Sequence, residues 1–160
     1  EVKDDSDRVI FRTTIYKCKK CGKKHAYNHK VQYYETDQMG IVHHSNYIRW
    51  FEEGRTEALD QLGFSYATME SMGVVSPVLS VECQYKTMTH FGDIVVINCE
   101  VTKYNGIRME IDYTVCDKET MEVRCTGKTS HCFLNKEGKI VSLKKDYPEM
   151  HKKVKLMLEK

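Results

Sequence analysis

The sequence has little of what long linkers, membrane spans and nucleic-acid contacts require. Only two of its 160 residues are proline, which excludes a long Pro-rich linker. No apolar run approaches the ~20 residues of a membrane-spanning helix, and the first residues show no signal-peptide pattern. The formal net charge of +2 is too close to balance to favour nucleic acid as a partner. We therefore expect one soluble, cytoplasmic domain without room for a separate cofactor-binding domain.

The cysteines divide into two groups. Their number, seven, is odd, and the missing secretion signal favours reduced thiols over a disulfide framework. Five cysteines lie in strand-like stretches, and we expect them to be small buried core residues: Cys83, Cys99, Cys116, Cys125 and Cys132. The pattern C-x2-C-x3-H-x3-H supplies four potential zinc ligands, Cys18, Cys21, His25 and His29. The usual zinc finger has a longer gap between its pairs, so we favour a Lys-rich turn with free thiols and keep zinc as the alternative.

Hydrophobic periodicity predicts one long helix and an antiparallel sheet. Alternation in residues 8–15 and 25–35 predicts an N-terminal hairpin around the Lys-rich turn. Helical spacing runs from a cap at Ser45 or Asn46 to Gly63, and a short helix follows at 65–72. Stretches typical of strands predict a four-strand meander at 74–87, 93–104, 107–117 and 122–135. A terminal helix is expected at 146–160.

The loop before the long helix is the best candidate for chemistry. The simplest way to bury the apolar stripe of the helix is to wrap the sheet around it. Residues 36–44 then lie at the helix N-terminus, where free N–H groups and the positive end of the macrodipole point outward. Asp37 in this loop would place a carboxylate beside those donors, which suits hydrolysis through an oxyanion. On spacing alone, the alternative is that Asp37 only caps a turn.

A longer motif surrounds this aspartate. Residues 31–47 read Val-Gln-Tyr-Tyr-Glu-Thr-Asp-Gln-Met-Gly-Ile-Val-His-His-Ser-Asn-Tyr. This resembles the signature of the 4-hydroxybenzoyl-CoA thioesterase family, which are acyl-CoA thioesterases of the hot-dog fold. The likeness runs from about residue 30 to 143, with Lys30 as a departure from the usual Gln or Arg. It implies an α+β hot-dog domain, placed at 25–160, with an antiparallel sheet around one central helix. The likeness does not cover the N-terminal extension at 1–24, where the alternation predicts the extra hairpin.

The resemblance also implies an activity and roles for three residues. The chain would be a thioester hydrolase that converts an acyl-CoA to a free acid and CoA, with no metal or organic cofactor. Asp37 matches the catalytic aspartate, as nucleophile or general base. The backbone N–H of His44 matches the donor that polarises the thioester carbonyl, and Tyr47 matches the aromatic residue that begins the helix. The site would lie between subunits of a homodimer or homotetramer.

Substrate contacts are expected from the same loop and from nearby basic turns. The candidates are Gly40, Ile41, Val42, His43, Lys86, His90, Lys103 and Arg108. Basic residues are included because CoA carries several phosphate charges. Two adjacent arginines that related enzymes often carry near the Asn-Gly hairpin at 105–106 are missing here.

Three alternatives stay open. Another hot-dog subfamily places its catalytic carboxylate on the helix, where this chain has Glu52, Glu53 and Glu57, although we expect these to form ion pairs or face solvent. An acidic acyl carrier protein could replace CoA, since residues 17–24 are rich in lysine. Some hot-dog proteins bind acyl groups without turning them over.

Overall fold

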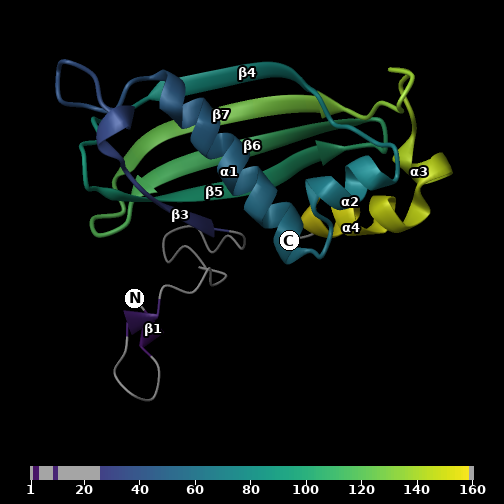
Figure 1. The fold of residues 1–160 in the computed structure, drawn as a ribbon, viewed down its shortest axis with the longest axis horizontal. Coiled ribbons are helices and arrows are strands. Elements are labelled where there is room, and N and C mark those ends of the chain that lie inside the picture. Colours follow the sequence, from purple (N-terminus) through teal and green to yellow (C-terminus); the bar gives the residue numbers. More distant parts are fainter. Residues whose placement is uncertain (1, 4–8, 11–25, 159–160) are drawn as a thin grey trace.

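The computed structural model describes residues 2–3, 9–10 and 26–158 of the chain. Its main feature is a five-stranded antiparallel sheet that curves along one long helix, α1 (Ser45–Gln61) (Figure 1). The sheet order is β3 (Ala26–Lys30), β5 (Ile94–Tyr104), β6 (Arg108–Asp117), β7 (Val123–Cys132) and β4 (Val78–Tyr85). The smaller elements are β1 (Val2–Lys3) paired with β2 (Val9–Ile10), the 3-10 helix η1 (Tyr33–Glu35), α2 (Tyr66–Ser71), α3 (Leu143–Asp146) and α4 (Pro148–Leu158). The predicted α+β fold is confirmed.

Large side chains on one face of α1 anchor it in the concave side of the sheet. Trp50 and Phe51 are fully buried, and the Phe51 ring stacks on Tyr113 of β6 with 4.4 Å between centroids. Two glycines allow this close approach. A Cβ at Gly127 of β7 would collide with the Phe51 ring, and a Cβ at Gly54 would lie 2.8 Å from Ile97 of β5. The helix position is therefore fixed by contacts along its length.

The predicted four-strand meander is wrong in one strand. β5, β6 and β7 follow one another, but β4 lies at the far edge beside β7, with Val81 opposite Thr129. β4 has no place next to β5, because β3 already pairs with that edge, with His29 opposite Val95. The chain therefore crosses the end of the sheet between β4 and β5.

Several local predictions also need correction. The strand expected at 25–35 ends at Lys30, where the chain turns into η1, and the strand expected from residue 74 begins at Val78. Neither Ser45 nor Asn46 caps α1 through its side chain. The residue at the N-cap position is His44, and the helix begins at Ser45. Most of the predicted N-terminal hairpin falls outside the described residues.

The core prediction for the cysteines holds. Cys99, Cys116, Cys125 and Cys132 are buried, Cys83 is partly buried, and all five are free thiols. No helix within the described ranges is both long and apolar enough to cross a bilayer.

The close approach of α1 to β7 makes a stability prediction. Gly127→Ala should lower the free energy of unfolding by about 1–3 kcal/mol, because the added methyl group overpacks the contact with Phe51. Urea unfolding followed by circular dichroism measures this change. The neighbouring Thr126→Ala, which changes a partly buried residue of the same strand, is the control. Equal stabilities of the two variants would contradict the packing.

Candidate active site

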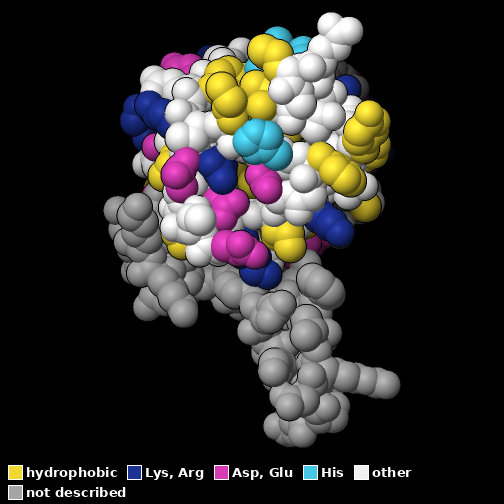
Figure 2. All heavy atoms as spheres, turned by 90° about the vertical axis from the view of Figure 1, so that its left-hand side faces the viewer, with side chains coloured by type: hydrophobic (Ala, Val, Ile, Leu, Met, Phe, Trp, Pro, Cys, Tyr) yellow, Lys and Arg dark blue, Asp and Glu magenta, His cyan; other side chains and the backbone are white. Residues whose placement is uncertain are grey.

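A cavity of about 340 Å³ opens between the loop before α1, the first turn of α1 and the chain that leaves β4. It is lined by Asp37, Met39, Ile41, Val42, His44, Tyr47, Tyr85, Lys86, Thr87, Met88 and Thr89. Figure 2 looks onto this end of the molecule, where exposed hydrophobic side chains lie close to histidine, acidic and basic groups. The cavity is large enough for a small organic group, since ligand pockets span roughly 300–1,000 Å³.

Asp37 begins a tight turn in the wall of this cavity. Its N–H donates to the Ile41 carbonyl at 2.9 Å, and the turn closes at Gly40, whose φ of +75° favours glycine. Oδ1 of Asp37 accepts from the Met39 N–H at 2.8 Å, and Oδ2 has no partner among the described residues. Both interpretations of Asp37 are therefore compatible with the structure: one oxygen caps a turn and the other is available.

His44 brings the start of α1 to the cavity. Its backbone N–H has no hydrogen-bond acceptor within the described part of the chain, which is normal for the first turn of a helix. The imidazole is exposed and lies against that of His43, tilted by 32° with 4.1 Å between centroids. The hydroxyl of Tyr85 donates to the His44 carbonyl at 2.9 Å and so ties the end of β4 to the helix start.

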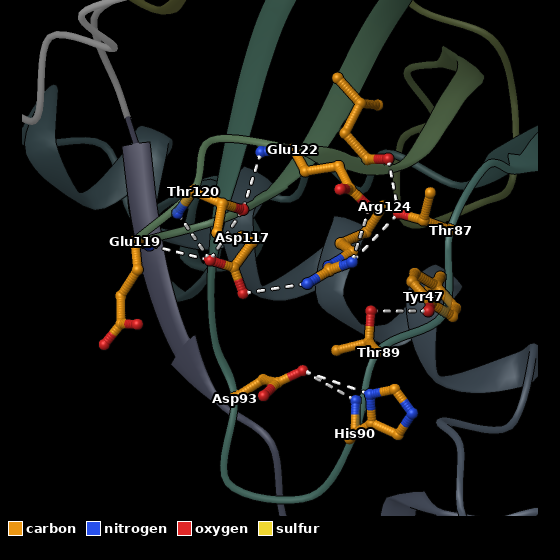
Figure 3. Close-up of polar contacts among 11 residues, drawn as sticks. Tyr47, Thr87, Thr89, His90, Asp93, Asp117, Glu119, Thr120, Glu122 and Arg124 are labelled. Atoms are coloured by element: carbon orange, nitrogen blue, oxygen red, sulfur yellow. Dashed lines mark hydrogen bonds and ion pairs between the residues drawn. The ribbon is translucent and has the colours of Figure 1, made fainter.

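Hydrogen bonds hold the opposite wall, residues 86–89. The buried hydroxyl of Tyr47 donates to Thr89 Oγ1 at 3.0 Å, and burial raises its pKa above the ordinary value (Figure 3). Arg124 of β7 donates to Thr87 Oγ1 at 3.2 Å and pairs with Asp117 at 3.2 Å (Figure 3). The hydroxyl of Tyr47 is thus committed to a positioning contact.

The buried carboxylate of Glu35 anchors the start of the loop that carries Asp37. Glu35 is 4% exposed and accepts from His29 Nε2 at 2.8 Å, from the Gln32 N–H at 2.8 Å and from Trp50 Nε1 at 2.9 Å. The second ring nitrogen of His29 lies 3.0 Å from Glu53 on α1. The helix glutamate Glu53 is therefore an ion-pair partner, as expected from the sequence.

These contacts favour the charged forms of both Glu35 and His29. Burial raises the pKa of Glu35, but the hydrogen bonds from Gln32, His29 and Trp50 outweigh it, so the pKa lies below its usual value. Burial lowers the pKa of His29, but the hydrogen bonds to Glu53 and Glu35 outweigh it, so the pKa lies above 6.5.

The remaining predicted site residues separate into near and distant groups. Ile41, Val42 and Lys86 line the cavity, Gly40 and His43 belong to its loop, and the exposed His90 bridges to Ile41. Lys103 and Arg108 instead flank the β5–β6 turn, which contacts α3 through Gly106. The turn lies roughly 30 Å along β5 from the cavity end, at ~3.3 Å per residue. Within one chain, these two residues do not meet Asp37.

Of the four candidate zinc ligands, only His29 lies in the described part of the chain. Both nitrogens of His29 face carboxylates, at 2.8 Å from Glu35 and 3.0 Å from Glu53. Cys18, Cys21 and His25 lie outside the described residues. No cluster of three or more metal-binding side chains occurs in the described part of the chain.

The residues that hold the cavity walls, Glu35, Tyr85 and Thr89, are not among those predicted from the sequence. Glu35 carries a local signal, because Gln32 and Glu35 form a capping box at the start of η1. Tyr85 and Thr89 carry none, since they lie about 40 residues from their partners on α1.

The ion pair of His29 predicts a pH dependence of stability. The raised pKa means that protonated His29 stabilises the fold below pH 6.5, and this contribution is lost as the pH rises through that pKa. The contribution of Glu35, whose pKa is lowered, is lost as the pH falls through that pKa. The difference in free energy of unfolding between wild type and His29→Gln should therefore shrink above pH 6.5.

Urea unfolding over a pH series measures this difference. His90→Gln is the control, because the His90 ring is 59% exposed and lies 3.9 Å from Asp93. A difference for His29→Gln that stays constant from about pH 5 to 9 would contradict a charged pair.

Comparisons with known proteins identify the family of the chain. Residues 31–155 match the family model described as the thioesterase-like superfamily. The protein YneP of Bacillus subtilis is 38% identical over 123 residues, which are 76% of this chain and 88% of that protein. The acyl-CoA thioesterase YbgC of Haemophilus influenzae is 29% identical over 119 residues, 69% of this chain and 88% of YbgC.

A solved structure shows the same fold. The DHNA-CoA thioesterase from Staphylococcus aureus superposes with a TM-score of 0.77 at 32% identity, covering 82% of this chain and 88% of that one. The resemblance predicted from the motif at residues 31–47 is confirmed at the level of the superfamily. The chain is a thioester hydrolase that belongs to the thioesterase-like superfamily.

Proposed function

We propose that the chain hydrolyses the thioester of an acyl-CoA at the cavity beside Asp37. One observation carries this proposal: a carboxylate oxygen and the N–H of His44 are both without partners in the described residues, and both residues line the same cavity. The cavity also has apolar walls from Met39, Val42 and Met88, which suit an acyl group. Similarity to YbgC and to the DHNA-CoA thioesterase favours CoA as the carrier.

The chemistry follows from these positions. The thioester carbonyl oxygen accepts from the His44 N–H, which stabilises the negative charge that develops on this oxygen. Asp37 either attacks the carbonyl carbon and forms an anhydride, or removes a proton from the attacking water. In both routes the C–S bond breaks, CoA leaves as a thiol and water supplies the acid oxygen.

The active unit is proposed to be a homodimer that pairs through β4. Val81, Cys83 and Tyr85 share one face of this edge strand, because alternate residues of a strand point the same way. Cys83 packs against the core and the Tyr85 ring contacts that of Tyr47, but Val81 and Tyr85 are still 38% and 49% exposed on that face. An exposed apolar edge strand is a ready surface for another strand. Since β4 leads into Lys86 and Thr87, a second copy paired there would border the cavity.

Replacing the carboxylate tests the chemistry. Asp37→Asn should lower kcat for hydrolysis of acyl-CoA by about 10²–10⁴, because an amide can neither attack the carbonyl nor accept the proton from water. Thiol release from short, long, branched and aryl CoA thioesters measures the rate and also identifies the acyl group.

The matched control is Asp60→Asn, the same substitution at an exposed residue near the end of α1. It should leave kcat unchanged. Full activity of Asp37→Asn would refute the role of Asp37, and a wild type that binds acyl-CoA without releasing thiol would favour a binding protein instead.

The dimer makes a separate prediction. Val81→Lys should convert the dimer to a monomer and lower activity, because the added charge would be buried in the proposed interface. Light scattering coupled to gel filtration measures the mass. Met72→Lys adds the same charge to an exposed apolar residue at the C-cap of α2 and should leave the dimer intact. A monomeric wild type with full activity would overturn the proposal.

A further inference from the structure

We propose that Glu35 is a positioning residue for the reaction, which holds the loop carrying Asp37 against α1. The inference rests on the proposed function, since it assigns Glu35 to the reaction at Asp37. Glu35 does not line the cavity and does not touch the reacting atoms. Its effect on the reaction would therefore pass through the loop.

The carboxylate of Glu35 connects three segments of the chain. It accepts from His29 on β3, from the backbone of Gln32 at the start of η1, and from Trp50 on α1, all within 2.9 Å. His29 belongs to the sheet and Trp50 to the buried face of α1, whereas Gln32 is the residue that directly precedes η1. The carboxylate thus joins the rigid part of the fold to the residue that precedes the loop.

The backbone carbonyl of Glu35 fixes the other end of the same loop. It accepts from the His43 N–H at 2.8 Å and from Asn46 Nδ2 at 2.8 Å. Residues 36–42 therefore form a small closed hairpin that begins and ends at Glu35, with Thr36 opposite Val42. Asp37 lies two residues from this anchor.

The opposite charges of Glu35 and His29 strengthen the attachment of the loop. Glu35 is 4% exposed, and an unpaired carboxylate in such a place would be neutralised or would leave the core. His29 supplies the opposite charge, and the groups that face His29 are Glu35 from η1, Glu53 from α1 and the ring of Trp50 at 4.9 Å. Tyr27 lies beside Glu53 and has a pKa raised to about 12 by burial and by Glu53, so it stays neutral.

Loss of the charge should move the loop without opening the fold. An amide at position 35 can still accept from Trp50, but its NH2 group cannot accept from the Gln32 N–H or from protonated His29. Misplacement of a reacting group by about 1 Å can cost on the order of 10²-fold in rate. The cost would fall on the chemical step, because most of the cavity wall belongs to other segments.

The experiment compares the two carboxylates that face His29. Glu35→Gln should lower kcat by about 10- to 100-fold and change KM by less than about threefold, at a temperature well below its Tm. Glu53→Gln is the matched control, because Glu53 pairs with the same imidazole but makes no contact with the loop. It should retain kcat within about threefold.

A milder variant covers the case in which Glu35→Gln does not fold. His29→Gln leaves the carboxylate with its contacts to Gln32 and Trp50, so it should fold and show an intermediate loss of kcat. If folded Glu35→Gln or, failing that, folded His29→Gln keeps the kcat of wild type, the proposal is overturned.

A double variant separates positioning from a general structural effect. Adding Glu35→Gln to Asp37→Asn should lower the residual rate by a smaller factor than it lowers the wild-type rate, because the group to be positioned is already gone. An equal factor in both backgrounds would mean that Glu35 does not act through Asp37, and would overturn the assignment. Failure of the proposed function is a different result, in which Asp37→Asn alone keeps full activity.

Discussion

The burial of one aromatic face of α1 is the constraint on which the other features depend. Trp50 and Phe51 are completely excluded from solvent, and Phe51 lies so close to the sheet that only glycine fits at position 127. Large aromatic rings bury much apolar area and pack in few orientations, so they fix the helix in depth and in rotation. The first turn of α1 is thereby placed at the end of the sheet, and the N–H of His44, which has no acceptor among the described residues, is held at the cavity before any substrate arrives.

The polar contacts around Glu35 satisfy a hydrogen-bond donor that this packing buries, the N–H of Trp50. The Trp50 ring is buried and its N–H needs an acceptor, because an unpaired buried donor costs roughly 1–3 kcal/mol. The Glu35 carboxylate supplies the acceptor but brings a charge that itself needs compensation, which His29 provides. Each buried polar group is thus satisfied by the next, and the chain of partners runs from β3 through η1 to α1. The same contacts tie down the ends of the loop at residues 36–42, so core packing and site geometry share their stabilising interactions.

The sequence predicts the elements better than their arrangement. The long helix, the strands at β5, β6 and β7 and the loop before the helix follow from periodicity and residue type, which act locally. The place of β4 does not, because the pairing of Val81 with Thr129 joins segments about 50 residues apart. His29 illustrates the same limit. Its spacing from Cys18 and Cys21 indicates a metal ligand, whereas its neighbours in space are Glu35 and Glu53. The sequence offers Ser45 or Asn46 as the helix cap, but the Asn46 side chain donates to the Glu35 carbonyl, a partner that only the folded loop provides.

The two sides of the cavity differ in how they are held, and this bears on specificity. The loop side is fixed within the chain by Glu35, and the Asp37 turn has internal hydrogen bonds that leave it little freedom. The β4 side is held by contacts to other segments, from Tyr85 to the His44 carbonyl and from Arg124 to Thr87, while the side chains of Lys86 and Met88 beyond the strand end stay exposed. Groups that perform the chemistry need a fixed geometry, whereas groups that select an acyl chain need only the right shape and polarity. In the proposed dimer, the second chain completes the β4 side of the cavity, which selects the acyl chain. Residues near Asp37 would then set the reaction, and the surface brought to β4 would set which acyl group is accepted.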